Sequence, residues 1–248
     1  MFEYLLLCIA GVFAGYINAM AGAGSLLTLP ALIFTGLDAN AANATNRISV
    51  LFQTIATSIT YKRHGIAIQK KQLWILFPSC VGGILGAYAA TRFSKEVFQV
   101  CIAIVMLFML PLNFIKKRNN DGSHTDLPFN WPTAFVFLAI GFYAGFIQAA
   151  AGLIILFYLA YATRMNLIQA NAIKVSIIMV LTLWALVTFF FFDAQIDFGR
   201  GLLLALSTAI GGVLGAHASV KRGEKLIRVV LTITVLASAA NLLWRALT

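Results

Sequence analysis

The sequence predicts an all-α polytopic membrane protein with two inverted repeats, each a helical hairpin plus three transmembrane helices, giving eight segments. Two observations predict the membrane environment. The chain is 61% hydrophobic and only 10% charged, with a mean hydropathy of +0.91, and several nearly uncharged stretches have the roughly 18 to 25 residues that a helix needs to cross about 30 Å of hydrocarbon. The third observation, an internal duplication, predicts the repeats.

Three motifs occur twice in the same order. They are Gly-Gly-Ile-Leu-Gly-Ala-Tyr at 82–88 and Gly-Gly-Val-Leu-Gly-Ala-His at 211–217, the related segments 11–18 and 141–148, and Ala-Asn-Ala at 42–44 and 170–172. Their offsets of 129, 130 and 128 residues define a first repeat at 1–115, a cytoplasmic linker at 116–132 and a second repeat at 133–248. Duplication in an apolar chain favours a transporter whose site lies between the repeats.

Each half contains five apolar elements. They cover 4–20, 25–36, 41–61, 72–91 and 97–115 in the first half, and 133–150, 153–163, 167–191, 201–219 and 226–244 in the second. The second element of the first half has 12 residues, about 18 Å of helix, which is shorter than the bilayer core. Small residues at 21–24 and 149–152 precede the short elements, so we expect each half to begin with a hairpin whose turn lies at membrane depth.

If the hairpins are re-entrant, the basic residues are distributed unequally between the two faces of the membrane. Only four fall on one face: Arg92, Lys95, Arg200 and Arg245. Twelve fall on the other: Lys62, Arg63, Lys70, Lys71, Lys116, Lys117, Arg118, Arg164, Lys221, Arg222, Lys225 and Arg228. The positive-inside rule makes the second face cytoplasmic, with the protein in the cell inner membrane and both termini outside. Three crossings per half then invert one repeat relative to the other, although ten full crossings would give the same charge pattern.

Other classes of protein fit poorly. The net charge of +10 lies in short clusters between apolar spans, which does not indicate a nucleic-acid partner. All eight acidic residues map to segment ends or loops, no catalytic motif occurs, and the three cysteines lack metal-ligand spacing. We therefore expect no enzyme, no catalytic residue, no metal and no cofactor.

Polar residues that enter the membrane predict an anion site near the two hairpin turns. Each half has an amide at the end of the first hairpin arm and a cation near the start of its third element, and helix N-termini and glycine amides add further donors. The candidate substrate-binding residues are Asn18, Gly22, Gly24, Asn43, Asn46, Arg47, Gln148, Gly152, Asn171 and Lys174.

Structural interpretations remain open for these residues. Arg47 and Lys174 could snorkel to the interface as anchors, and their positions are one residue out of register, about 100° apart on an ideal helix. Asn18 and Gln148 could simply cross-link helices. The glycine sets at 82–86 and 211–215 are typical of close-packed helix faces, which also makes a homodimer plausible.

The repeat pattern, the run Gly-Tyr-Ile-Asn-Ala-Met-Ala-Gly-Ala-Gly-Ser at 15–25 leading to Pro30, and Ala-Asn-Ala-Thr-Asn-Arg at 42–47 together resemble the TauE/SafE family of sulfite and organosulfonate exporters. The resemblance covers essentially the whole chain and implies an inner-membrane permease, usually of eight segments, that moves small sulfur-containing or related organic anions outward. The second half differs from the usual pattern at Ala172-Ile173-Lys174. We expect alternating access between the repeats; a passive anion channel, or transport of a non-sulfur small carboxylate, is the alternative.

Overall fold

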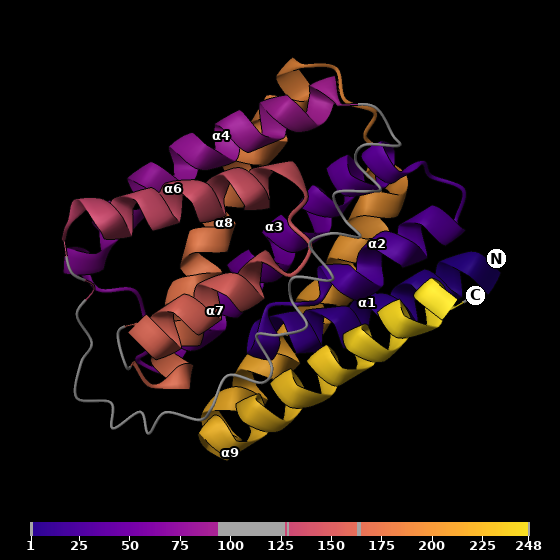
Figure 1. Cartoon of the computed structure of the whole chain (residues 1–248). Helices are drawn as coiled ribbons and strands as arrows, with labels where there is room; N and C mark the ends of the chain where they lie inside the picture. The colour runs from indigo at the N-terminus through magenta and orange to yellow at the C-terminus, as the bar shows by residue number, and fades with distance from the viewer. Residues whose placement is uncertain (1, 94–126, 128, 163–164, 248) are drawn as a thin grey trace.

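The computed structural model describes residues 2–93, 127, 129–162 and 165–247, and within these ranges every regular element is a helix (Figure 1). The elements are α1 (Phe2–Ala21), α2 (Ser25–Phe34), α3 (Ala39–Arg63), the 3-10 helix η1 (Lys70–Ile75), α4 (Leu76–Arg92), α6 (Trp131–Phe146), α7 (Ala151–Ala162), α8 (Leu167–Phe191) and α9 (Phe198–Leu247). The all-α prediction is confirmed for this part of the chain. The predicted element at 97–115 and most of the predicted linker at 116–132 lie outside the described residues.

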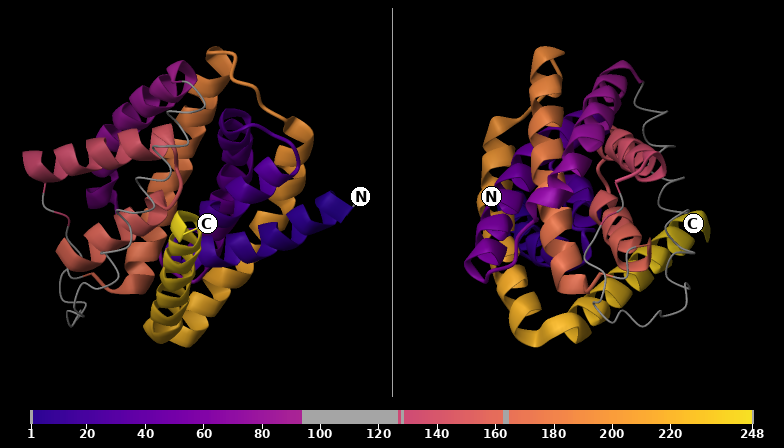
Figure 2. Two further views of the ribbon diagram at one scale, coloured as in Figure 1. Left: turned by 45° about the vertical axis from the view of Figure 1, so that its right-hand side comes forward. Right: turned by 90° about the vertical axis from the view of Figure 1, so that its left-hand side faces the viewer.

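Local sequence signals explain where these helices begin and bend. The side chains of Asp38, Asn130 and Asn166 cap the first turns of α3, α6 and α8 by accepting hydrogen bonds from backbone N–H groups three residues further on, at 2.9, 3.0 and 2.8 Å. Helix α9 bends sharply at Gly223, whose φ of 69° and ψ of −167° are not helical (Figure 2). This bend separates the two elements that the sequence predicted at 201–219 and 226–244.

Within the described residues, four helical stretches are long and apolar enough to cross a membrane: Glu3–Ala21, Lys70–Arg92, Leu167–Phe191 and Phe198–Gly223. Helices α2, α6 and α7 are apolar but shorter. Helix α3 has 25 residues, about 37 Å, yet it is much more polar than the others. Most of its polar side chains are buried because α3 packs against α2, α8 and α9. Protein surrounds most of this helix, so its hydropathy does not resemble that of a helix facing lipid.

Both short elements form hairpins with buried turns. Helix α2 packs against α1, and Gly24 lies so close to α1 that a Cβ atom there would be 2.3 Å from the carbonyl oxygen of Ala14. The second turn, between α6 and α7, includes Gln148 and Ala150 in the left-handed region, with φ values of 64° and 57°. Residues 18–25 and 144–153 are all buried by other parts of the chain.

The two halves exchange their first helices. Helix α1 packs against α9, and α6 packs in return against α4, beside which it lies in Figures 1 and 2. Glycines allow both approaches: a Cβ on Gly15 would be 2.1 Å from the carbonyl oxygen of Thr208, and one on Gly145 would be 2.1 Å from that of Gly83. The glycine faces at 82–86 and 211–215 are therefore occupied within one chain, which confirms them as packing surfaces and gives the predicted homodimer no support.

Contacts between helix ends define two ends of the molecule. At the end that we call the pocket end, Arg200 donates a 3.0 Å hydrogen bond to the carbonyl oxygen of Thr35, and the rings of Tyr88 and Phe192 meet at 4.8 Å between centroids. At the end that we call the basic end, the rings of His64 and His217 meet at 4.9 Å. Lys62 and Arg63 precede His64 in the sequence, and Lys221 and Arg222 follow His217 within five residues. Basic residues at this end are expected both for re-entrant hairpins and for ten full crossings.

Candidate functional site

The turns of the two hairpins touch each other. A Cβ atom on Gly22 would lie 2.3 Å from the carbonyl carbon of Gly152, and one on Gly152 would lie 2.7 Å from the Cα of Gly22. Gly22 also has a φ of +76°, a conformation that suits glycine. The contact brings together the two segments that the sequence predicted to form the site.

Lys174 of the second half binds the end of the first hairpin arm. Its ammonium group donates hydrogen bonds to the carbonyl oxygens of Asn18 at 2.9 Å and Ala19 at 3.2 Å, and to Oδ1 of Asn171 at 2.5 Å. These carbonyls belong to the last turn of α1, which carries the negative end of the helix dipole. The carbonyl oxygen of Asn18 also accepts a 3.0 Å bond from the N–H of Gly22, and that of Ala19 accepts a 3.4 Å bond from the hydroxyl of Tyr61. The side chain is 1% exposed, and its three N–H groups all have partners.

Arg47 of the first half binds the end of the other hairpin arm in the same way. Its Nη1 and Nη2 atoms donate to the carbonyl oxygens of Ala144 and Gly145, both at 2.7 Å. Asn43 accepts a 3.3 Å bond from Arg47 and donates a 3.0 Å bond to the carbonyl oxygen of Phe146. The guanidinium group also lies 5.3 Å from the ring centroid of Phe189. Each half thus supplies a cation that caps the first arm of the opposite hairpin.

The one-residue difference in register between the two cations does not disturb this equivalence. Lys174 binds Asn171 three positions before it, and Arg47 binds Asn43 four positions before it. Positions three and four residues apart share one helix face, so either spacing places the cation beside its asparagine. The interpretation of both residues as interface anchors is wrong, because Arg47 is 0% exposed and its bonded atoms lie on the opposite hairpin.

The two hairpin amides are held by their own halves. Nδ2 of Asn18 donates to Oε1 of Gln53 at 2.6 Å, while its Oδ1 accepts from the backbone N–H of Gly24 at 3.3 Å. Nε2 of Gln148 donates to the hydroxyl of Thr182 at 2.7 Å. Gln53 and Thr182 were not among the predicted site residues, although they are 129 residues apart and match through the repeat offset. Asn46 reaches Ser25 of α2 through a 3.4 Å bond.

Several polar atoms of this region have no partner. Among the described residues, seven buried side-chain atoms lack a hydrogen bond, and three of them belong to predicted site residues: Nε of Arg47, Nδ2 of Asn171 and Oε1 of Gln148. The first two are donors. A buried unpaired donor is costly in a packed protein, and an acceptor that arrives with a ligand removes that cost.

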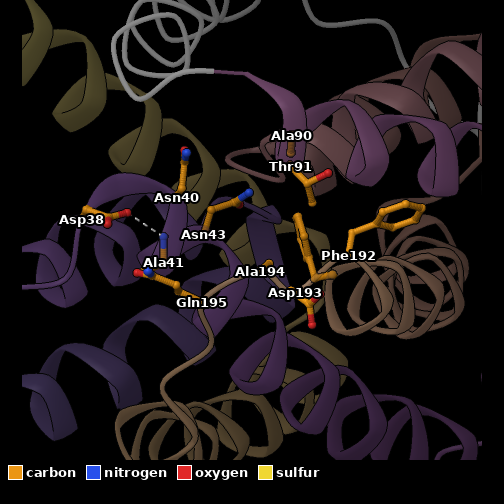
Figure 3. A pocket seen from close by; sticks show the side chains of 11 residues that line it. Asp38, Asn40, Ala41, Asn43, Ala90, Thr91, Phe192, Asp193, Ala194 and Gln195 are labelled. Atoms are coloured by element: carbon orange, nitrogen blue, oxygen red, sulfur yellow. Dashed lines mark hydrogen bonds between the residues drawn. The ribbon is translucent and has the colours of Figure 1, made fainter.

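A pocket of about 250 Å³ lies at the pocket end (Figure 3). Its walls come from the start of α3, the end of α4 and the end of α8 with the segment that follows. Asn43 and Phe189 line it, and both contact the guanidinium group of Arg47. The carboxyl groups of Asp38 and Asp193 also line this pocket. The predicted site residues therefore fall into two groups, one around Lys174 and one around Arg47 that borders the pocket.

Comparison with known proteins gives a consistent assignment. The profile of the family described as sulfite exporter TauE/SafE matches residues 7–242. The "Probable membrane transporter protein ORF9" of Sinorhizobium sp is 27% identical over 239 residues, covering 96% of this chain and 91% of its own length. "Probable membrane transporter protein YfcA" of Escherichia coli K12 is 26% identical over 240 residues, covering 94% and 87%. A "Probable membrane transporter protein" of Haemophilus influenzae is 25% identical over 242 residues, covering 97% and 94%. No solved structure matches the chain.

Proposed function

Since the chain belongs to the TauE/SafE family of membrane transporters, we propose that it is a secondary transporter that exports small sulfur-containing or related organic anions such as sulfite or sulfonates. The observation that carries this proposal is the pair of buried cations at the two touching hairpins. Among the described residues, both cations bind only neutral oxygens. Two positive charges therefore remain in the interior, and an anion is the ligand that lowers their electrostatic cost.

The substrate site lies on the Arg47 side of the hairpins. Lys174 already uses all three of its N–H groups, whereas Nε of Arg47 is unpaired and its neighbours Asn43 and Phe189 line the pocket. An oxyanion that enters this pocket and displaces Asn43 could accept hydrogen bonds from the guanidinium group, which suits the planar arrangement of oxygens on a sulfonate or carboxylate.

Alternating access follows from the exchange of helices between halves. The reciprocal packing of α1 on α9 and α6 on α4, with a cation from each half on the opposite hairpin, supports the inverted-repeat arrangement. We propose that one repeat rocks against the other, so that Arg47 opens to the pocket end in one state and Lys174 to the basic end in the other. The contact between Gly22 and Gly152, and the 2.8 Å bond between Tyr61 and Ser219, separate the pocket from the basic end, which favours a carrier over a passive channel.

The test is flux of labelled sulfite, taurine and sulfoacetate, with acetate as the carboxylate alternative, through proteoliposomes. We expect saturable flux that speeds up when the same anion is present on the opposite side, since a carrier returns faster when loaded. Arg47→Gln and Lys174→Gln should each lose most of this saturable flux. Lys62→Gln removes the same charge from an exposed position on the basic end and should retain it. Flux that does not saturate would identify a channel, and full activity in both buried variants would refute the cation site.

A further inference from the structure

The pocket beside Arg47 carries negative charge as well. Asp38 and Asn40 line it from the start of α3, and Asp193 lines it from the segment after α8 (Figure 3). Mainly polar atoms face the pocket. Its volume of about 250 Å³ exceeds that of a bare ion but is below the roughly 300–1,000 Å³ of pockets for drug-sized ligands. A simple anion in this pocket would meet two carboxylate groups, and like charges repel.

Asp193 occupies a position that is unfavourable for its charge. Its φ of 51° lies in the left-handed region, which glycine adopts more easily. It follows the last turn of α8, where the negative end of the helix dipole disfavours a carboxylate. In the part of the chain that the structure describes, no hydrogen bond or ion pair reaches this carboxylate. Arg92 and Arg200, at the same end, contact the ring of Tyr88 and the carboxylate of Asp197 instead.

The matching positions of the other half are uncharged. Helices α3 and α8 begin 128 residues apart and end 128 residues apart, which pairs Asp193 with Gly65 and Asp38 with Asn166. Gly65 has the same left-handed backbone, with a φ of 75°. Asn166 caps α8 with a 2.8 Å bond, as Asp38 caps α3 with a 2.9 Å bond. The fold therefore requires neither carboxylate, so both charges need another explanation.

One acceptor at the pocket lacks a partner. Oδ1 of Asn40 is buried and accepts no hydrogen bond, and the residue that matches Asn40 in the second half is the apolar Ile168. A buried acceptor without a partner indicates a missing donor. Asn40 and Asn43 are three residues apart on α3, so about 5–6 Å separates their Cβ atoms, and Asn43 accepts a bond from Arg47. A donor at Asn40 and an acidic group at Arg47 can thus belong to one small molecule.

We propose that Asp38, Asn40 and Asp193 bind an ammonium group. The substrate of this pocket is then a small zwitterion with a short spacer, such as a 2-aminosulfonate, whose acidic group binds Arg47; this second part rests on the function proposed above. An ammonium group has three N–H donors and no acceptor. It supplies the missing donor, offsets the charge of Asp193 and suits the C-terminal end of α8. The same carboxylates disfavour an anion that has no amine.

The test compares three ligands of similar size by calorimetric titration of the purified full-length protein in detergent at pH 7, where an aliphatic amine is charged. Taurine carries both charges, isethionate has a hydroxyl in place of the ammonium group, and ethanolamine has a hydroxyl in place of the sulfonate. Charge-assisted hydrogen bonds are roughly twice as strong as neutral ones. We therefore expect the Kd of taurine to be at least about tenfold lower than that of either analogue.

The variants exchange each carboxylate for the residue that the other half uses. Asp193→Gly should raise the Kd of taurine about tenfold, lower the Kd of isethionate and keep the Tm at least as high, because the left-handed strain is gone. Asp193→Asn, which keeps the shape and tolerates this conformation, should shift both constants in the same directions. Asp38→Asn should act more weakly, because the N-terminal end of α3 already stabilises that carboxylate.

The matched control is Asp197→Asn, which removes the same charge at the same end from a residue that does not line the pocket. It should leave the Kd values of taurine and isethionate unchanged. Opposite shifts for the two ligands in the Asp193 variants would support the proposal, because damage to the fold weakens both. A ratio of the two constants that stays the same in both Asp193 variants would overturn it.

The three ligands also separate this proposal from the proposed function. Equal binding of taurine and isethionate, lost in Arg47→Gln, would support the anion function and reject the ammonium site. Ethanolamine that binds as tightly as taurine, and more weakly to Asp193→Gly, would support the ammonium site and reject the anion function. Binding of none of the three ligands would overturn the proposal.

Discussion

Arg47 and Lys174 perform the same task with different side chains, and the difference determines what else each can do. An ammonium group has three donors and Lys174 uses all of them, whereas a guanidinium group has five and Arg47 uses three, which leaves its Nε atom without a partner. The pocket borders the Arg47 side. We therefore propose that the lysine has chiefly a structural role and that the arginine has chiefly a ligand-binding role.

We expect Arg47→Lys to lose stability although it keeps the charge. The nitrogen of a lysine lies one bond closer to the backbone than the Nη atoms of Arg47, so at this position it cannot reach both carbonyl oxygens, those of Ala144 and Gly145, and an unpaired buried acceptor costs about 1–3 kcal/mol. Chemical unfolding in detergent measures the loss. Arg63→Lys, an exposed change of the same kind, should stay within about 0.5 kcal/mol. Equal losses in the two variants would show that the fork does not matter.

A second expectation concerns Gly22. In Gly22→Ala the new methyl group would meet the backbone of Gly152 at 2.3 Å, and neither backbone can move without separating the turns. Gly36 has a similarly positive φ of 93°, but a methyl group added there would meet no atom within 4 Å, so Gly36→Ala isolates the cost of the left-handed conformation, about 1–2 kcal/mol. In thermal unfolding, the loss of stability in Gly22→Ala should exceed that cost by several kcal/mol, or the variant should fail to accumulate in cells. Equal Tm values would show that the turns tolerate separation.

The sequence singled out the buried polar residues of the two hairpins but not their partners. Asn18, Gln148, Arg47 and Lys174 stand out because polar groups are rare in apolar spans. The two cations bind backbone carbonyls 97 to 156 residues away, and a carbonyl is present at every position, so no sequence pattern marks the ones that are used. Repeat alignment could have found Gln53 and Thr182, which are polar at matched positions.

Among the elements, α3 shows why hydropathy alone misjudges a central helix. Asn43, Asn46, Arg47 and Gln53 make it too polar to be recognised as a span by composition, yet each is buried against another helix. The length of the helix and the short hairpins around it were predictable, because length and glycine content are local properties. The exchange of α1 and α6 between the halves was not, since it depends on which glycine faces meet.

The start of α9 gives a pH-dependent prediction. Asp197 caps this helix by accepting a 2.8 Å bond from the backbone N–H of Arg200, and that bond, helped by the Arg200 side chain, lowers the pKa of Asp197. A lowered pKa in the folded state means that the stabilisation is complete above the ordinary value near 4 and is lost as the pH falls through the folded-state pKa.

Asp197→Ala should therefore destabilise the protein by about 0.5–2 kcal/mol at pH 7, and the difference from wild type should shrink at acid pH. Unfolding measured from pH 7 down to pH 3 shows this trend. Asn166→Ala removes a cap of similar geometry from α8, but amides do not titrate, so its cost should stay constant over the same range. A constant cost for Asp197→Ala would mean that ionisation contributes nothing to this cap.

For the whole molecule, the arrangement of charges predicts the orientation in the membrane. The exposed residues Lys62, Arg63, Lys221 and Arg222 belong to the basic end, while Gly199 is exposed near Arg200 at the pocket end. The positive-inside rule predicts that the basic end is cytoplasmic, so we expect the pocket to open outward and the structure to represent an outward-open state of the proposed exporter.

Impermeant maleimide labelling of intact cells tests this orientation. In a background with Cys8, Cys80 and Cys101 replaced by serine, Gly199→Cys should react in intact cells, whereas Arg63→Cys should react only after the membrane is permeabilised. The replaced arginine is one of many basic residues at its end, so one substitution does not reverse the charge asymmetry. The opposite labelling pattern would place the pocket in the cytoplasm. Arg47 would then face the compartment where an exported anion is loaded, and the same structure would be the inward-open state.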